Sequence, residues 1–89
     1  MKQVKAGDYI LYKMKNEIGV VKRVTERGCF AWFHTGDTAA HITPEHFETL
    51  DPHYVAFNHS KFANNYAYAS LAKRRIDILL ENSNLREKN

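Results

Sequence analysis

The sequence predicts a mostly β domain that ends in an α-helix: five short antiparallel strands come first, and one C-terminal helix follows them. Three observations lead to this fold class. Runs of β-branched and aromatic residues recur through the first fifty residues and are separated by turn residues. The intervals between the runs are shorter than the roughly dozen residues that a parallel crossover needs, so neighbouring strands must be antiparallel. From residue 58 onward the chain has neither glycine nor proline, and its apolar residues take helical spacing.

The strands are delimited by short polar or glycine-containing segments. Gly7 precedes the first run, the segment 14–16 follows it, and the segment Thr35–Asp37 separates the third run from the fourth. Gly28 can supply the positive φ that a hairpin turn between the second and third strands often needs. The expected strands are Asp8–Lys13, Glu17–Val24, Cys29–His34, Thr38–Ile42 and Phe47–Leu50.

A single helical turn is expected between the fourth and fifth strands. Thr43 can cap its start, Pro44 suits the first helical position because its fixed φ is helical, and Glu45 favours the first turn. The next strand begins at Phe47, which leaves room for one turn only.

The segments AGDYILY and NEIGVVKRV carry a Gly-Asp pair at the start of the first strand and a glycine followed by alternating valines in the second. These features resemble the opening of Src-homology-3-like small barrels, in particular those of the Tudor, KOW and CarD type. The resemblance covers residues 4–50 and rests on Gly7, Asp8, Ile10, Gly19, Val21 and Val24. It implies a five-stranded antiparallel barrel, which we expect to pack against the C-terminal helix, and it implies contacts with nucleic acid or with the transcription and translation machinery. A fold of this kind carries no specific activity by itself.

The expected organisation is a small β-barrel at residues 1–52, a connecting loop and C-terminal helix of the same domain at 53–84, and a flexible tail at 85–89. The start of the helix has two solutions. Asn58 or Ser60 could cap it early, or Asn65 could cap a helix that begins at Tyr66.

The apolar residues of this helix cover an arc of about 200°, whereas packing on one surface needs roughly 100°. They are Tyr68, Leu71, Ala72, Ile76, Ile78, Leu79 and Leu80. The surplus requires a second partner, which is either the loop at 51–57 or another copy of the protein. Arg75 lies inside the arc, where its stem can pack while the guanidinium reaches the edge.

Composition and charge limit the class of protein. With 89 residues, 44% hydrophobic and 26% charged, the chain is one small globular domain rather than a disordered one. The single cysteine fits a reducing compartment, and no apolar run approaches the ~18 residues of a membrane span, so we expect a soluble cytoplasmic protein without a membrane partner.

Residues 1–27 carry seven basic and three acidic side chains, residues 28–57 carry four acidic and no basic ones, and the remainder carries six basic and three acidic. This segregation indicates either a bipolar surface or charges that neutralise one another in the fold.

The segment FAWFHTGDTAAHITPEHF holds three of the five histidines and raises the question of a metal site. His34, Asp37 and His41 flank the tip of an expected hairpin and are the candidate ligands, whereas His46 lies on the helical turn. Neither a His-x-x-x-His pair nor a Cys-x-x-Cys motif accompanies them. We therefore predict that the histidines bind no metal and that the protein needs no cofactor.

Motifs for nucleophilic catalysis are lacking in the sequence as well. Cys29 and His34 differ by five positions and so point to opposite faces of one strand, and Cys29 is expected to be a small buried hydrophobe. The sequence has no nucleophile elbow, no glycine-rich phosphate loop and no obvious carboxylate pair. We expect a protein that is not an enzyme.

Alternate residues of a strand share a face, so a small barrel cannot bury all of these aromatic side chains in its interior. In the interpretation that we favour, the C-terminal helix covers the outward ones with Tyr66, Leu71, Ile76 and Leu79. In the other interpretation the outward aromatics stay open and line a ligand groove. The candidates for that groove are Tyr9, Tyr12, Phe30 and Trp32.

Two function classes are consistent with these features. The first is a small non-catalytic binding module that contacts nucleic acid, with a stacking surface from Trp32 or Tyr9. Its phosphate contacts would be Lys13, Lys15, Lys22, Arg23 and Arg27. The second is a protein-interaction or self-associating regulatory protein, of the kind encoded by phages and mobile elements, which could form a homodimer through the C-terminal helix. Its interaction residues would be Arg74, Arg75, Ile78 and Leu79. The sequence favours a binding module and leaves its partner, protein or nucleic acid, open.

Overall fold

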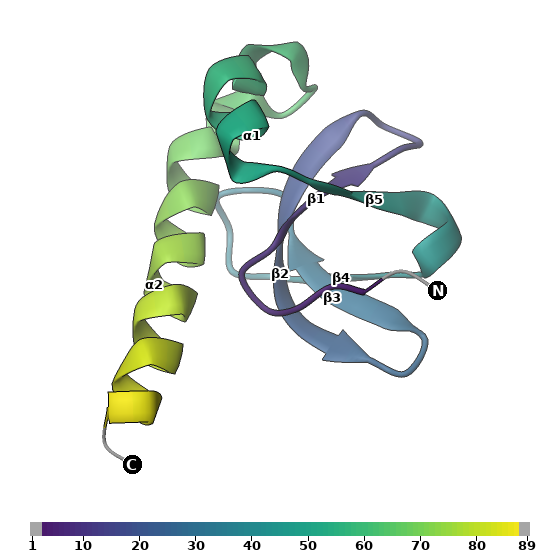
Figure 1. Cartoon of the computed structure of the whole chain (residues 1–89). Coiled ribbons are helices and arrows are strands. Elements are labelled where there is room, and N and C mark those ends of the chain that lie inside the picture. The colour runs from purple at the N-terminus through teal and green to yellow at the C-terminus, as the bar shows by residue number, and fades with distance from the viewer. Residues whose placement is uncertain (1–2, 88–89) are drawn as a thin grey trace.

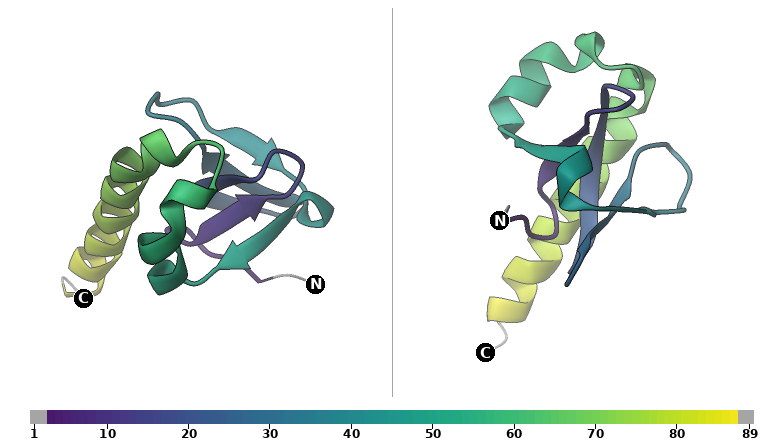
Figure 2. Two further views of the ribbon diagram at one scale, coloured as in Figure 1. Left: turned by 90° about the horizontal axis from the view of Figure 1, so that it is seen from above. Right: turned by 90° about the vertical axis from the view of Figure 1, so that its right-hand side faces the viewer.

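The computed structural model describes residues 3–87 and confirms the predicted fold class of five antiparallel strands followed by a C-terminal helix. The strands are β1 (Tyr9–Tyr12), β2 (Glu17–Thr25), β3 (Gly28–Trp32), β4 (Ala40–Ile42) and β5 (Phe47–Leu50). The helices are η1 (Pro44–His46), α1 (Pro52–Asn58), η2 (His59–Lys61), η3 (Asn65–Ala67) and α2 (Tyr68–Glu87), where η marks a 3₁₀ helix. Helix α2 lies along one face of the sheet, and α1 lies beside its N-terminal part (Figures 1 and 2).

The five strands form one curled sheet in the order β4-β3-β2-β1-β5. β5 forms one edge of the sheet, beside β1, and β4 forms the other edge, beside β3. Because β4 and β5 do not pair with each other, the sheet is not a closed barrel. The expectation of closure is therefore wrong. The physical reason lies in β4, which has three residues and is followed at once by η1, so the chain leaves the sheet before it can complete the ring. β2 joins the two parts, since it pairs with β1 through residues 17–20 and with β3 through residues 20–25, with a bulge at Lys22 within the second pairing.

Both faces of the curled sheet are covered by apolar residues. The concave face holds Ile10, Val21, Cys29, Ala31, Phe33, Ile42 and Phe47, which we call the inner cluster. The opposite face carries the outer cluster, which also includes residues of α1, α2 and their connection: Tyr9, Ile18, Val20, Trp32, Val55, Phe62, Ala67 and Leu71. The strands are consequently apolar on both sides over much of their length, which explains the continuous hydrophobic runs in the sequence.

Two glycines allow the sheet to curl this tightly. An added Cβ at Gly19 would lie 2.6 Å from Cε1 of Phe33, so the ring of Phe33 can enter the inner cluster only because Gly19 has no side chain. Gly28 has a φ of +154°, and an added Cβ there would collide with the backbone oxygen of Ile42. The positive φ expected at Gly28 is present, and its lack of a side chain lets β4 approach β3.

Residues 53–58 form part of helix α1, where we expected a loop. Asp51 caps this helix, because its Oδ1 accepts hydrogen bonds from the backbone nitrogens of His53 at 2.7 Å and Tyr54 at 3.4 Å, and Pro52 occupies the first helical position. Val55 is fully buried in the outer cluster. The expected single turn is present as η1, although the side chain of Thr43 makes no capping hydrogen bond there.

The connection between α1 and α2 is fixed to the sheet by a buried side chain, that of Asn64, which is 1% exposed. Its Oδ1 accepts from the backbone nitrogen of Ile18 at 3.1 Å, and its Nδ2 donates to the carbonyl oxygens of Ile18, at 2.9 Å, and Phe33. These bonds hold the chain away from a continuous helix, so α2 begins only at Tyr68 and not at any of the expected starts. Helix α2 continues through residues 85–87 of the segment expected to be a tail, and residues 88–89 lie outside the described residues.

Candidate nucleic-acid interface

Helix α2 lies over a row of three side chains that runs across the sheet. Tyr9 of β1 is the register partner of Val20 of β2, and Val20 is the partner of Trp32 of β3. Tyr9 is 4% exposed, Trp32 is 8% exposed, and Val20 is fully buried. Two of the four candidates for an open aromatic groove are therefore enclosed beneath the helix.

The other two aromatic candidates lie on different faces of the sheet. The ring of Tyr12 packs at the inner cluster with its centroid 5.8 Å from that of Phe33, so it cannot share a groove with the side chains beneath α2. Phe30 lies on the outer face, beyond the part that α2 covers, and is half-buried. The four aromatics thus do not form one groove, and Phe30 alone combines the outer face with an accessible ring.

The helix covers the sheet with a different set of side chains from the one predicted. Of Tyr66, Leu71, Ile76 and Leu79, Leu71 is fully buried, whereas the other three are at least 40% exposed. Tyr66 precedes α2 and its hydroxyl lies 3.3 Å from Nδ1 of His34. The side chains that complete the contact are Ala67, Tyr68 and Ile78, together with two consecutive arginines.

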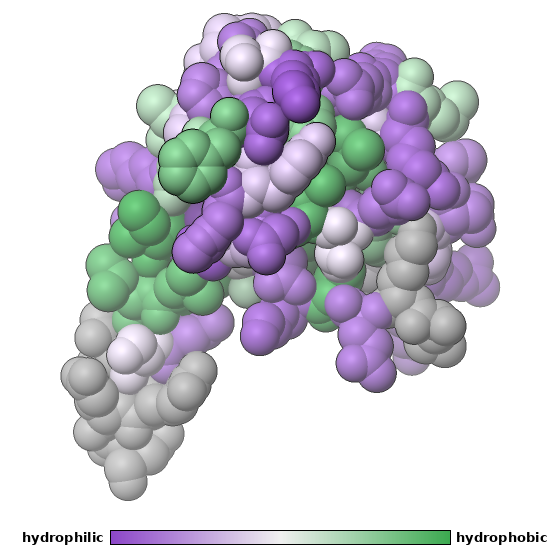
Figure 3. Space-filling view, turned by 45° about the horizontal axis from the view of Figure 1, so that its top comes forward, coloured by the Kyte–Doolittle hydropathy of each residue, from purple (hydrophilic) through white to green (hydrophobic). Residues whose placement is uncertain are grey.

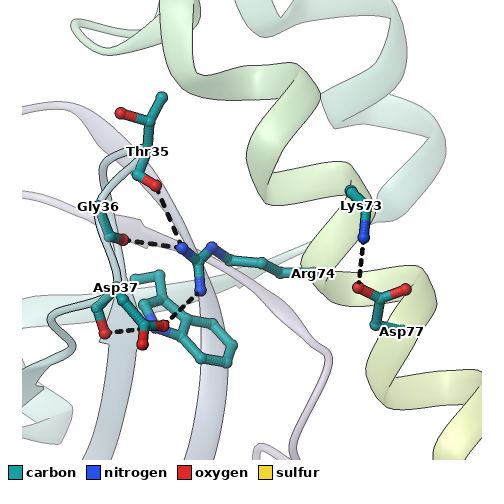
Figure 4. A network of polar contacts seen from close by, with 7 residues as sticks. Thr35, Gly36, Asp37, Lys73, Arg74 and Asp77 are labelled. Atoms are coloured by element: carbon teal, nitrogen blue, oxygen red, sulfur yellow. Dashed lines mark hydrogen bonds and ion pairs between the residues drawn. The ribbon is translucent and has the colours of Figure 1, made fainter.

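Arg74, the first of these arginines, fastens the β3–β4 loop to α2 (Figure 4). Its Nη1 lies 3.1 Å from Oδ1 of Asp37, and its Nη2 donates to the carbonyl oxygens of Thr35 at 3.2 Å and Gly36 at 2.9 Å. Its guanidinium lies over the ring of Trp32, whose Nε1 donates to the carbonyl oxygen of Asp37 at 3.2 Å. The Arg74 side chain is only 20% exposed, so these intramolecular bonds occupy a residue that we expected to meet a partner protein.

The remaining residues of the predicted interaction helix diverge. Arg75 lies over the ring of Tyr9, with 5.5 Å between its guanidinium carbon and the ring centroid. Ile78 packs against the outer cluster, and Leu79 stays 40% exposed. Arg74 and Arg75 thus lie over aromatic rings on the two strands that flank β2.

The three candidate metal ligands do not converge. His34 contacts Tyr66, Asp37 is paired with Arg74, and Nε2 of His41 lies 2.9 Å from Oγ1 of Thr25. Among the described side chains, those of residues 3–83, no group of three histidine, cysteine, aspartate or glutamate residues is placed to hold a metal ion. Cys29 is buried in the inner cluster, and burial raises the pKa of its thiol to about 11.

The five basic candidates form two separate groups. Lys13 and Lys15 lie in or beside the β1–β2 turn, whereas Lys22, Arg23 and Arg27 lie on the far part of β2 and in the β2–β3 turn. Lys15 and Lys22 are seven positions apart, which corresponds to roughly 23 Å of extended strand. One short ligand segment therefore meets one group or the other.

The second group surrounds an ordered row of side chains, Arg23, Phe30 and His41, which we call the Phe30 row. These residues are register partners across β2, β3 and β4. The guanidinium carbon of Arg23 lies 4.2 Å from the centroid of the Phe30 ring, and the ring of His41 meets Phe30 edge-on at 5.0 Å. Lys22 lies beside the row, with its Nζ 5.6 Å from the Trp32 ring.

The cations of this group have no carboxylate partner among the described residues, although Glu26 lines the hollow that Arg27 shares with Phe30 and His41. Within the described part of the chain, Lys22, Arg23 and Arg27 form no ion pair, in contrast to Lys73, whose Nζ lies 2.9 Å from Asp77. In the sequence analysis His41 was only a candidate ligand for a metal site that we predicted to be absent. Its place opposite Phe30 could not have been found from the expected strands, because a turn at residues 35–37 would pair residue 30 with residue 42, whereas the structure pairs Phe30 with His41.

Comparisons with known proteins add no further assignment to these surfaces. None of the helices in residues 3–87 combines the length and apolar character of a membrane-spanning segment. The chain matches no family model, and it matches neither a curated protein nor a solved structure.

Proposed function

We propose that the protein is a small non-catalytic module that binds single-stranded nucleic acid through the Phe30 row and the cations Lys22 and Arg27. One observation carries the proposal: a half-buried aromatic ring, Phe30, lies in line with a guanidinium and an imidazole, and cations without carboxylate partners surround it. The proposal places the protein in the cytoplasm, where it would contact RNA or the transcription and translation machinery.

The chemistry of the row suits unpaired bases. Planar groups such as the Phe30 ring, the Arg23 guanidinium and the His41 imidazole can stack on a base, and stacking on an aromatic side chain contributes about 1–3 kcal/mol per base. In a duplex the bases are stacked on one another and offer only their edges, so this contribution requires a single strand. Lys22 lies by the Trp32 ring beside the row, and Arg27 lines a hollow with Phe30 and His41, so both could neutralise the phosphates that flank such a base.

The strand arrangement supports a finer assignment of the fold. The order β4-β3-β2-β1-β5, the bulged and bent β2, and the single helical turn that precedes β5 are features expected of the Src-homology-3-like small barrel, here open between β4 and β5. On this assignment the protein resembles Tudor, KOW and CarD-type modules. The proposed interface, however, depends on the Phe30 row and not on the fold.

Binding of fluorescently labelled twelve-nucleotide RNA and DNA strands and of the matching duplex, measured by anisotropy over a series of salt concentrations, tests this function. We expect single strands to bind more tightly than the duplex, and Phe30→Ala to weaken binding by about 5- to 100-fold. The triple variant Lys22→Gln, Arg23→Gln and Arg27→Gln should also reduce the salt slope by roughly 2. The matched control is Lys13→Gln with Lys15→Gln, which removes two cations at the other end of β2. Equal losses in the control, or no binding at low salt, contradict the proposal.

A further inference from the structure

A second concave surface lies between α1 and α2, away from the Phe30 row. This α1–α2 cavity has a volume of about 350 Å³ and is lined by residues that include Tyr9, Ala56, Phe57, Ala72, Arg75 and Ile76. Phe57 is 86% exposed, and Ile76 is about half exposed, so both present apolar surface at the rim. The space-filling view shows hydrophobic residues gathered on the side of the molecule where α2 runs (Figure 3).

Arg75 gives this cavity a positive charge that none of its lining side chains balances. Its Nε is buried without a hydrogen-bond partner, and none of the side chains that the structure describes, those of residues 3–83, forms an ion pair with Arg75. None of the residues that line the cavity is acidic. The neighbouring Arg74 shows the contrast, since its guanidinium has a carboxylate and two carbonyl oxygens as acceptors.

The guanidinium of Arg75 is also held in place before any ligand binds. Its stem lies in the helix surface, and its planar group lies over the Tyr9 ring at 5.5 Å. Because Nε is buried, the accessible donors are the two terminal nitrogens, which can bind the two oxygens of one carboxylate side by side. A positioned guanidinium loses little conformational freedom on binding.

We propose that the α1–α2 cavity binds a small monocarboxylate whose carboxylate pairs with Arg75 and whose apolar body lies between Phe57 and Ile76. Cavities of roughly 300 Å³ or more that are largely apolar, with a few placed polar groups, are typical of small-molecule sites. A neutral apolar ligand would leave the guanidinium unpaired, and an ammonium would be repelled by it. This site goes beyond the proposed nucleic-acid function and shares no residue with the Phe30 row.

A second copy of the chain fits this cavity less well than a carboxylate does. In a two-fold dimer the same surface meets itself, so each copy would bring its own Arg75 toward a cavity that has no acidic lining residue. The exposed residues Leu79 and Leu80 extend the apolar surface along α2 but add no negative charge.

Titration with three matched probes, followed by NMR of protein labelled with ¹³C in its tyrosines and ¹⁵N in its arginines, tests the site. The probes are 4-phenylbutyrate, 4-phenylbutan-1-ol and 4-phenylbutylamine, which share one apolar body and differ in their charge. We expect 4-phenylbutyrate to bind at least about tenfold more tightly than the alcohol, because a charge-assisted pair exceeds a neutral one, and the amine to bind most weakly.

Burial, the hydroxyl of Tyr68 and its hydrogen bond raise the pKa of Tyr9, while Arg75 lowers it. A carboxylate on Arg75 should therefore raise the pKa of Tyr9 further, whereas the alcohol should not.

Three variants complete the test. Arg75→Gln should remove the preference for 4-phenylbutyrate and leave the affinity for the alcohol within about twofold. Lys73→Gln, which changes an exposed cation of the same helix, should alter neither affinity. Ala72→Phe should fill the cavity and abolish binding of both probes, and Phe30→Ala should leave them unchanged. The proposal is overturned by equal affinities for the three probes, by failure of all three to bind, or by a dimer in sedimentation that Ile76→Ser dissociates.

Discussion

The guanidinium carbon of Arg74 lies 4.6 Å from the centroid of the Trp32 ring, and the same group binds the carbonyl oxygens of the loop that follows β3. One side chain of α2 therefore connects the helix to a strand and to the loop that follows that strand. Both lie about forty positions before Arg74 in the sequence. Most of what the structure adds to the sequence consists of links of this kind, and each can be tested by substitution.

Replacing Arg74 should loosen the β3–β4 loop and destabilise the fold. Arg74→Lys keeps the positive charge but cannot reach three acceptors with one planar group, so we expect a loss of about 2 kcal/mol in the free energy of unfolding. Urea denaturation followed by the fluorescence of Trp32, the single tryptophan, measures it. Lys73→Ala, next along the helix and exposed, should cost less than about 0.5 kcal/mol. Equal effects of the two variants would show that the Arg74 bonds do not stabilise the fold.

Asn64 should be one of the most sensitive positions. Asn64→Ala removes three buried hydrogen bonds and leaves backbone groups of Ile18 and Phe33 unpaired, so we expect a loss of about 3 kcal/mol, measured by thermal and urea unfolding. Asn65→Ala is the matched control, since the adjacent amide is exposed and should contribute less than about 0.5 kcal/mol. A stable Asn64→Ala protein would mean that the α1–α2 connection is held by its apolar contacts alone.

The close approach of Gly19 to Phe33 predicts a coupled pair of substitutions. Gly19→Ala places a methyl group 2.6 Å from the Phe33 ring and should destabilise the fold by about 1–3 kcal/mol. Phe33→Leu removes the ring atoms that the methyl group meets, so the double variant should be more stable than the sum of the single effects implies. A double-mutant cycle in urea measures this coupling, and strict additivity would contradict the packing described here.

Cys29 should make stability depend on pH in the alkaline range. Its thiol has a pKa of about 11 in the folded protein, against an ordinary value of 9.0. Below pH 9 both states keep the proton. Between pH 9 and 11 only the unfolded chain releases it, so the free energy of unfolding should fall as the pH rises, by about 2 kcal/mol in total.

The comparison with Cys29→Ala isolates this effect. The variant should lose less stability between pH 9 and 11 than the parent does, while any contribution from Tyr9, whose pKa is also raised, remains in both proteins. Identical slopes of stability against pH in the two proteins would show that the thiol is accessible to water in the folded state. Reaction with a thiol reagent at pH 8 gives a second measurement, and it should be slow until denaturant is added.

Local patterns in the sequence were sufficient to predict the β-strands. Alternating or continuous apolar runs between turn residues located all five, and β5 was predicted at its observed bounds. Helix α1 was missed even though Asp51 and Pro52 repeat the pattern of cap and proline that indicated a helical turn at Thr43 and Pro44. The segment after Pro52 is short and rich in aromatic residues, which have a weak helix propensity. Its helix therefore depends on the burial of Val55, a contact that the local pattern does not show.

The candidate surfaces were less predictable, because they depend on contacts between distant residues. Arg74 and Arg75 are chemically identical neighbours that both lie over an aromatic ring, but only Arg74 lies beside the β3–β4 loop, which supplies its three acceptors, whereas Nε of Arg75 is buried without one. The basic candidates could be listed from the sequence, but their division into two groups required the length and direction of β2. The inner position of Tyr12, by contrast, follows from the alternation along β1, which puts Tyr12 on the face of Ile10 and not on that of Tyr9.

The bulge in β2 has a consequence for how this sheet acquired its shape. Val21 is opposite Ala31 and Arg23 is opposite Phe30, so Lys22 is an extra peptide unit with no partner on β3. Deleting it would leave every other pair of the two strands intact and every side chain on its present face. The ladder would only lose its local twist, and the concave pocket that shelters Phe33 and Phe47 would flatten. The bulge thus gives β2 a local bend without altering which residues of β2 and β3 face each other.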